Sequence, residues 1–272
     1  MADGQGPWTR GLPLVCLGGA WQMAIDAWLL EQDQPALRLY RWQRPCLSVG
    51  RHQRRLPASW LELAARGAIE LVRRPSGGGA VLHGGDLAYG LVWPQPPPNR
   101  RQAYRQACRW LQEAFAALGQ PLHFGERPAS LAVASCFATA TAADLVHDDG
   151  SKRIGSAQLW RGGRLLQHGS IQLAPDPGLW RQLFGSPPPA LPPLPGGESG
   201  LEAALMAAAA RWLPLPALRE QPWSAAELAA IASRLDQCRL EGAPPPPAAA
   251  VSSTSPEASI DRTTWGRASP RG

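Results

Sequence analysis

The spacing of apolar and polar residues in the N-terminal half predicts a short strand, then a helix, then a second strand. Residues 1–10 are mostly polar, and we expect a loose terminus before a first strand at Leu14–Leu17. Apolar positions then recur at helical spacing from about Ala20 to Gln32, where we place Asp26 on the solvated face. The segment ALRLYRW alternates apolar and polar residues, which predicts a half-buried strand over Ala36–Trp42.

The same criteria predict the remaining elements. We expect strands at Cys46–Val49, Ile69–Val72, Ala80–His83, Asp86–Val92, Leu122–Phe124, Ala142–Val146, Ile154–Trp160 and Leu165–Leu173. We expect helices after Pro57, over Arg100–Leu118 behind an Asn99 cap, and over Gly178–Phe184, Glu198–Trp212 and Ser224–Arg239. An Arg-Gly-Gly turn at Arg161–Gly163 joins the last two strands as a hairpin.

Strands and helices mix here without regular alternation. This order predicts an α+β fold with a mixed, mainly antiparallel sheet flanked by helices and a small C-terminal helical annex. We assign residues 1–185 to the main domain and 186–241 to a proline-rich linker with the annex. Residues 242–272 are low in large apolar side chains, which predicts a disordered tail.

Composition narrows the function classes. The 272 residues carry a formal charge of +6, but no run of basic residues exceeds two, so we expect no nucleic-acid partner. Five cysteines, odd in number and without a CxxC pair, argue against a disulfide framework and a structural zinc site. No apolar stretch reaches membrane-spanning length, and no signal peptide opens the chain, so we expect a cytoplasmic protein without membrane contact.

A glycine-rich segment, RRPSGGGAVLH, connects two predicted strands. The triplet Gly77–Gly79 allows close approach of backbone N–H groups to a ligand, and Arg73 and Arg74 precede it where they could meet an anionic group. The alternative is a flexible hairpin tip. The segment lacks both the G-x-G-x-x-G of a dinucleotide site and the G-K-[ST] of a phosphate loop.

The stretch 136–170 holds the most distinctive residue types. Lys152 is the single lysine among 27 basic residues, and its ammonium is a compact donor that arginine cannot replace. Chance placement on a loop is the alternative. Cys136 ends a predicted loop, and a thiolate beside an ammonium suits acyl transfer, although a free cysteine is commonly a small buried hydrophobe. His83 and His168 are candidate proton carriers or structural histidines.

Several motifs together resemble one family. RRPSGGGAVLH followed by DLAY, SKRIGSAQ (Ser151–Gln158) and LLQHGSIQL (Leu165–Leu173) occur in the order found in the lipoate–protein ligase A superfamily, whose fold biotin–protein ligases share. MAIDAWLL and PALRLYRWQRPCLSVGRHQ are similar to the same family. The pair Cys136–Phe137 upstream of the lysine motif most resembles the cysteine-dependent octanoyltransferases of this superfamily.

This resemblance implies transfer of octanoate from acyl carrier protein, through a Cys136 thioester, to a lysine of a lipoyl domain or the glycine cleavage H protein. It implies Cys136 and Lys152 as catalytic residues, with no metal and no cofactor. The substrate-binding residues that it implies, together with the two arginines read from the loop, are Arg73, Arg74, Ser76, Gly77, Gly78, Gly79, His83, Gly155, Ser156, Ala157 and His168.

Two departures leave other functions open. The glycine triplet is unbroken, as in the ligases, and ATATAADL after Phe137 lacks the residues expected in the transferase branch. The alternatives are an ATP- and Mg²⁺-dependent lipoate–protein ligase and a non-catalytic binder of an acyl group or carrier protein.

Overall fold

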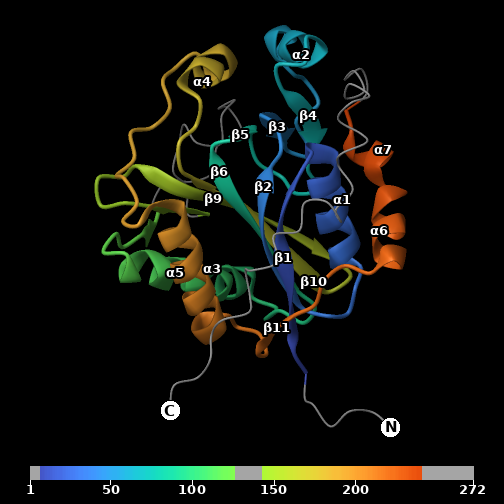
Figure 1. Cartoon of the computed structure of the whole chain (residues 1–272), viewed down its shortest axis with the longest axis vertical. Helices are drawn as coiled ribbons and strands as arrows, with labels where there is room; N and C mark the ends of the chain where they lie inside the picture. Colours follow the sequence, from blue (N-terminus) through green and yellow to red (C-terminus); the bar gives the residue numbers. More distant parts are fainter. Residues whose placement is uncertain (1–6, 126–142, 241–272) are drawn as a thin grey trace.

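The computed structural model describes residues 7–125 and 143–240 of the chain. Within them, the main sheet has eight strands in the order β11-β1-β2-β6-β10-β9-β8-β7 (Figure 1). β1 pairs in parallel with β2 and β11, and the other neighbours are antiparallel, which confirms the predicted mixed, mainly antiparallel sheet. The strands are β1 Thr9–Leu17, β2 Ala36–Trp42, β6 Asp86–Trp93, β7 His123–Phe124, β8 Asp144–Val146, β9 Lys152–Arg161, β10 Arg164–Gln172 and β11 Leu218–Glu220.

A smaller sheet carries the glycine-rich segment. Its strand order is β4-β3-β5, with bounds β3 Cys46–Val49, β4 Glu70–Arg73 and β5 Val81–His83. β3 pairs in parallel with β4 and antiparallel to β5. Since β4 and β5 lie on opposite sides of β3, the segment between them crosses over that strand, and the hairpin-tip alternative is wrong.

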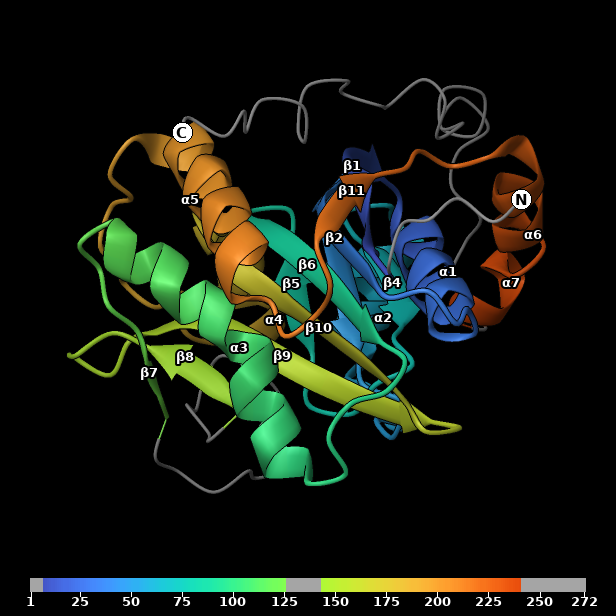
Figure 2. The ribbon, with the colours of Figure 1, turned by 90° about the horizontal axis from the view of Figure 1, so that it is seen from below.

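Helices cover both faces of the main sheet. α1, α6 and α7 lie on one face, and α3 and α5 lie on the other, as the view from below shows (Figure 2). α2 and α4 pack on the smaller sheet. The helices are α1 Gly19–Leu30, α2 Ala58–Ala65, α3 Arg100–Ala117, α4 Pro177–Phe184, α5 Gly197–Trp212, α6 Ala225–Ala232 and α7 Leu235–Cys238. None of the helices described combines the length and apolar character that crossing a membrane requires.

The C-terminal segment is built onto this core at three places. β11 extends the sheet beside β1, α5 packs on α3, and α6 and α7 pack on α1. The sequence pattern missed β11, and the predicted helix Ser224–Arg239 is interrupted between α6 and α7.

Two expectations from the pattern were wrong for the same reason. We expected the first strand to begin at Leu14, but β1 begins at Thr9. Its polar residue Arg10 is buried in an ion pair with Glu227 of α6. β2 is buried at nearly every position, since helices cover both of its faces and its polar residue Arg38 is paired inside. Arg10 and Arg38, the arginines that the pattern treats as solvated, form buried or largely buried ion pairs.

Candidate functional site

β10 supplies a row of buried polar side chains that face α1 and the smaller sheet. His168, Ser170 and Gln172 occupy alternate positions, so they share one face of the strand. Their exposed fractions are 5%, 2% and 0%. Buried polar groups need partners. Two carboxylates, from α1 and β6, bind His168 and Ser170, and Gln172 donates to Ser170 Oγ at 2.9 Å.

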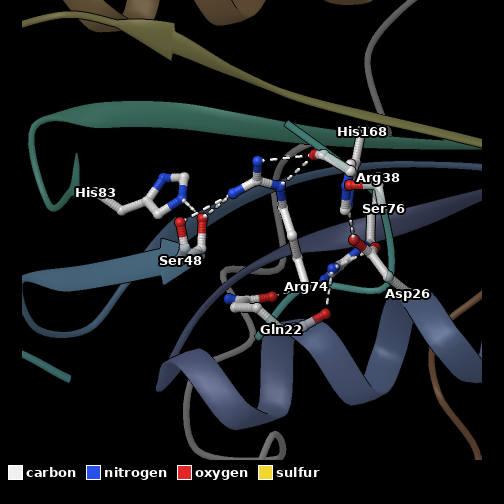
Figure 3. A network of polar contacts seen from close by, with 9 residues as sticks. Gln22, Asp26, Arg38, Ser48, Arg74, Ser76, His83 and His168 are labelled. Atoms are coloured by element: carbon white, nitrogen blue, oxygen red, sulfur yellow. Dashed lines mark hydrogen bonds and ion pairs between the residues drawn. The ribbon is translucent and has the colours of Figure 1, made fainter. Parts of the chain in front are cut away.

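The first partner is Asp26, which we expected on the solvated face of α1; that expectation was wrong. Its side chain is fully buried and binds Arg38 through Oδ1 at 2.6 Å and His168 Nδ1 through Oδ2 at 2.6 Å. His168 Nε2 lies 2.5 Å from the Oγ of Ser76. The structure therefore contains a buried Asp–His–Ser chain, which begins on α1 and ends beside the glycine triplet (Figure 3).

Electrostatics fix the proton positions in this chain. Burial alone raises the pKa of Asp26, but Arg38 and His168 outweigh burial and leave that pKa below its ordinary value. An ionised carboxylate can only accept hydrogen bonds. His168 Nδ1 therefore donates to Asp26, and its Nε2 bonds the hydroxyl of Ser76.

A second chain of the same type begins at Asp86, the first residue of β6. Its Oδ2 lies 2.7 Å from His83 Nδ1, and His83 Nε2 lies 2.8 Å from the Oγ of Ser48. Ser170 of β10 also donates to Asp86 Oδ2 at 2.6 Å. The indole of Trp42 stacks on the His83 ring at 3.9 Å. The imidazole of His83 is therefore fixed by hydrogen bonds at both nitrogens and by the indole stacked on its face.

Arg74 lies between the two chains and holds the glycine segment. Its guanidinium donates to the carbonyl oxygens of Ser48 at 2.9 Å, Gly77 at 2.8 Å and Gly79 at 2.5 Å. Arg73 donates to the carbonyl oxygens of Gly50 and Gln53, each at 2.9 Å. Both arginines thus bind backbone carbonyls, and their contact with an anionic substrate group stays a prediction.

The glycine triplet is tightly packed on one side and open on another. A Cβ at Gly50 would lie 2.0 Å from the carbonyl oxygen of Gly78, whereas a Cβ at Gly77 would meet nothing within 4 Å. Gly78 has a φ of 95°, which favours glycine. Within the described part of the chain, no backbone carbonyl accepts a hydrogen bond from the N–H groups of Gly77–Gly79. Such amides are suitable donors to a carbonyl oxygen.

Lys152 reaches the same face of the sheet through an irregularity in β9. Leu145 lies opposite Ile154, but Val146 lies opposite Lys152, so β9 has one residue more than β8 at this point. Asp144 lies opposite Gly155, which in turn pairs with Ser170, so Asp144 and the β10 row share a face. Lys152 Nζ lies 2.8 Å from Asp144 Oδ1, and each side chain is 3% exposed. A chance lysine on a loop does not fit this buried ion pair.

The motif after Lys152 divides between the two faces of the sheet. Gly155 and Ala157 lie opposite Ser170 and His168. Ser156, by contrast, bonds the hydroxyl of Tyr89 at 2.8 Å on the face that α3 covers. Among the predicted binding residues, Ser156 is therefore separated from the others by the sheet. Cys136 lies outside the described residues.

Sequence reasoning missed the partners that organise these groups. They are Gln22, Asp26, Arg38, Ser48, Asp86 and Asp144. One local signal was available, because Asp86 follows His83 by three residues in a turn. The others pair with residues on different elements of the fold and left no local signal.

Comparisons with known proteins agree on one family. Residues 19–189 match the family model described as the lipoyl protein ligase A/B catalytic domain. Octanoyltransferase LipM of Kyrpidia tusciae is 36% identical over 175 residues, which cover 58% of this chain and 63% of that protein. LipM of Geobacillus kaustophilus is 36% identical over 185 residues, covering 62% of this chain and 66% of that protein. The chain thus spans a little under two thirds of the length of these relatives.

Solved structures show the same fold. Lipoate-protein ligase A with ATP bound superposes with a TM-score of 0.66 at 20% identity, covering 84% of this chain and 95% of that one. A bi-partite lipoate protein ligase of Thermoplasma acidophilum has a TM-score of 0.65 at 19% identity, covering 85% and 93%.

Proposed function

The chain belongs to the lipoyl protein ligase A/B catalytic-domain family, and from that premise we propose that it is a protein N-octanoyltransferase. In this proposal it takes an octanoyl group from acyl carrier protein and passes it to a lysine of a lipoyl domain or of the glycine cleavage H protein. Similarity to LipM octanoyltransferases over the matched region supports this choice of reaction.

The observation that carries the proposal is the placement of the single lysine. The ammonium of Lys152 is buried beside Asp144, on the sheet face that also carries His168 and Ser170. A fixed positive charge in a buried site stabilises a developing oxyanion far better than a solvated one, because water does not screen it.

The proposed chemistry has two steps. The thiol of Cys136 gives up its proton, and the resulting thiolate attacks the thioester carbonyl of the donor. A C–S bond to Cys136 forms, the C–S bond to the carrier protein breaks, and the carrier-protein thiolate leaves and takes up the proton that Cys136 lost. The unprotonated amine of the acceptor lysine then attacks the Cys136 thioester, an amide forms, and the Cys136 thiol is released. In both steps Lys152 donates a hydrogen bond to the oxyanion, and the Gly77–Gly79 amides are additional candidate donors.

The two imidazoles have a positioning role in this scheme. His168 bonds Ser76, the residue before the glycine triplet, and His83 bonds Ser48 of β3, the strand that the glycine segment crosses. Since carboxylates fix both rings, the loop keeps one conformation while the acyl group binds. No nucleotide or metal takes part in this reaction.

The ligase alternative has two sequence features in its favour, the unbroken glycine triplet and the segment ATATAADL after Phe137, which lacks the residues expected in the transferase branch. A single experiment separates the two reactions. The protein is incubated with octanoyl-acyl carrier protein without ATP, and its mass is measured. We expect an octanoyl adduct that is absent from the Cys136→Ala variant. Modification of a lipoyl domain that requires ATP and free lipoate, and that survives Cys136→Ala, would establish the ligase instead.

A further inference from the structure

The turn between β3 and α2 carries positive charge that the proposed chemistry does not use. Arg51, Arg54 and Arg55 are all exposed. In the described part of the chain, none of the three has an acidic partner. Arginines without a carboxylate nearby produce a positive local potential at the surface.

α2, which follows this turn directly, adds an apolar side chain to the same surface. Leu61 is 46% exposed and is the one exposed large hydrophobic side chain among the described residues. Trp60, Leu63 and Ala64 face the core, so Leu61 points away from it. Ala58 and Ala65 are exposed as well and extend this apolar face with small side chains. An apolar centre with charged neighbours is the usual composition of a protein-binding surface.

This surface adjoins the glycine triplet and is held rigidly against it. The backbone N–H of Arg51 donates to the carbonyl oxygen of Ser76 at 2.9 Å. Arg73 binds the carbonyl oxygens of Gly50 and Gln53 within the turn. The indole of Trp60 donates to the carbonyl oxygen of Leu183 at 2.8 Å, which joins α2 to α4. A protein bound here would lie beside the loop that faces the acyl carbonyl.

We propose that Arg51, Arg54, Arg55 and Leu61 form the docking surface for the acidic carrier protein that delivers the acyl thioester. This inference rests on the proposed function and names the surface that its donor uses. Charge complementarity supports an acidic partner, and Leu61 supplies an apolar anchor for one side chain of that partner. The position beside Ser76 places the donor where its acyl group can enter at the glycine triplet.

The test compares an acyl donor bound to its carrier protein with a small thioester donor that has no protein part. Arg54→Glu with Arg55→Glu reverses the charge of two exposed side chains, and Leu61→Gln removes the apolar anchor. We expect each variant to raise the KM for octanoyl-acyl carrier protein about tenfold or more in formation of the acyl-enzyme. The rate with octanoyl-N-acetylcysteamine, which has no protein part, stays at the wild-type value. The charge-reversal effect shrinks at about 1 M salt, where the screening length is about 3 Å.

A matched control carries the same change elsewhere. Arg100→Glu with Arg101→Glu alters two adjacent exposed arginines at the start of α3, in a different part of the fold, and leaves the KM for the carrier protein unchanged. Equal losses in both double variants, or an effect confined to transfer onto the lipoyl domain, would overturn the inference. Binding of the carrier protein, followed by fluorescence anisotropy, tests the surface even if no acyl transfer occurs. Tight binding without transfer contradicts the proposed function alone.

Discussion

Arg38 Nη2 lies 2.6 Å from Asp26 Oδ1 in an ion pair whose side chains are 1% and 0% exposed. Two further bonds from the guanidinium reach Gln22, at its side-chain and main-chain oxygens. The carboxylate uses its other oxygen for His168. The Asp–His–Ser chain is thus anchored by a buried arginine, and its geometry depends on that pair.

Removing one member of this pair should destabilise the fold strongly. In Asp26→Ala the guanidinium of Arg38 stays buried without its carboxylate, and we expect a loss of about 3–5 kcal/mol in the free energy of unfolding. Asp33→Ala breaks the surface pair with Arg164, whose side chains are 89% and 31% exposed, and should cost about 0–1 kcal/mol. Urea denaturation measures both. If both variants lose the same small amount of unfolding free energy, water solvates the guanidinium of Arg38 in Asp26→Ala and the prediction is wrong.

Lys152 should contribute to turnover more than to substrate binding. We expect Lys152→Met to lower kcat for acyl transfer by about 10²–10³, the usual cost of losing one oxyanion donor. Lys152→Arg keeps the charge but introduces a planar fork beside Asp144, so we expect it not to restore the rate. Single-turnover kinetics with octanoyl-acyl carrier protein measures the effect. Wild-type kcat in Lys152→Met contradicts the assigned role.

The glycine segment offers a matched pair of substitutions. Gly50→Ala places a methyl group 2.0 Å from the carbonyl oxygen of Gly78, so the backbone of the triplet has to shift. We expect its rate of acyl transfer to fall by about 10²-fold, because misplacement by about 1 Å costs that much. Gly77→Ala adds a methyl group that meets no protein atom within 4 Å, so it serves as the control for folding. Circular dichroism and the transfer rate of both variants are compared with wild type.

The sequence predicted helix caps and turns correctly, because these depend on contacts between residues close together in the chain. Asn99 caps α3, as expected, by accepting from the N–H of Gln102 at 3.0 Å. Gly162 and Gly163 take φ values of 56° and 77° in the predicted hairpin turn. In each case the residue type and its neighbours decide the backbone conformation.

Buried charge could not be predicted in the same way. Asp26 bonds His168, 142 residues later, and Arg10 bonds Glu227, 217 residues later. A polar residue on an amphipathic helix or near a terminus has the same local pattern whether it faces water or a distant partner. The family motifs predicted His83, Lys152 and His168 as candidate site residues, but the carboxylates of Asp26 and Asp144 that bind two of them became visible only in the fold.

His147 provides a test of stability against pH. Its Nε2 accepts from Arg153 Nε at 2.9 Å, so the imidazole has to be neutral in the folded chain. Burial, and then the charge of Arg153, lower the pKa of His147, although Asp148 and Asp149 oppose them. Burial also lowers the pKa of Arg153 to about 10, so this guanidinium stays charged near neutral pH.

The direction of the effect follows from proton binding. In the unfolded chain the pKa of a histidine is about 6.5. As the pH falls through that value, His147 binds a proton in the unfolded state but not in the folded state. The free energy of unfolding therefore decreases. We expect it to fall more steeply between about pH 8 and about pH 5.5 in wild type than in His147→Gln, whose amide oxygen can accept from Arg153 without titrating. Urea midpoints and slopes measure this difference, with His52→Gln at an exposed position as the control for the substitution itself. The same pH profile in His147→Gln and wild type would show that His147 accepts the proton in the folded state as readily as in the unfolded chain.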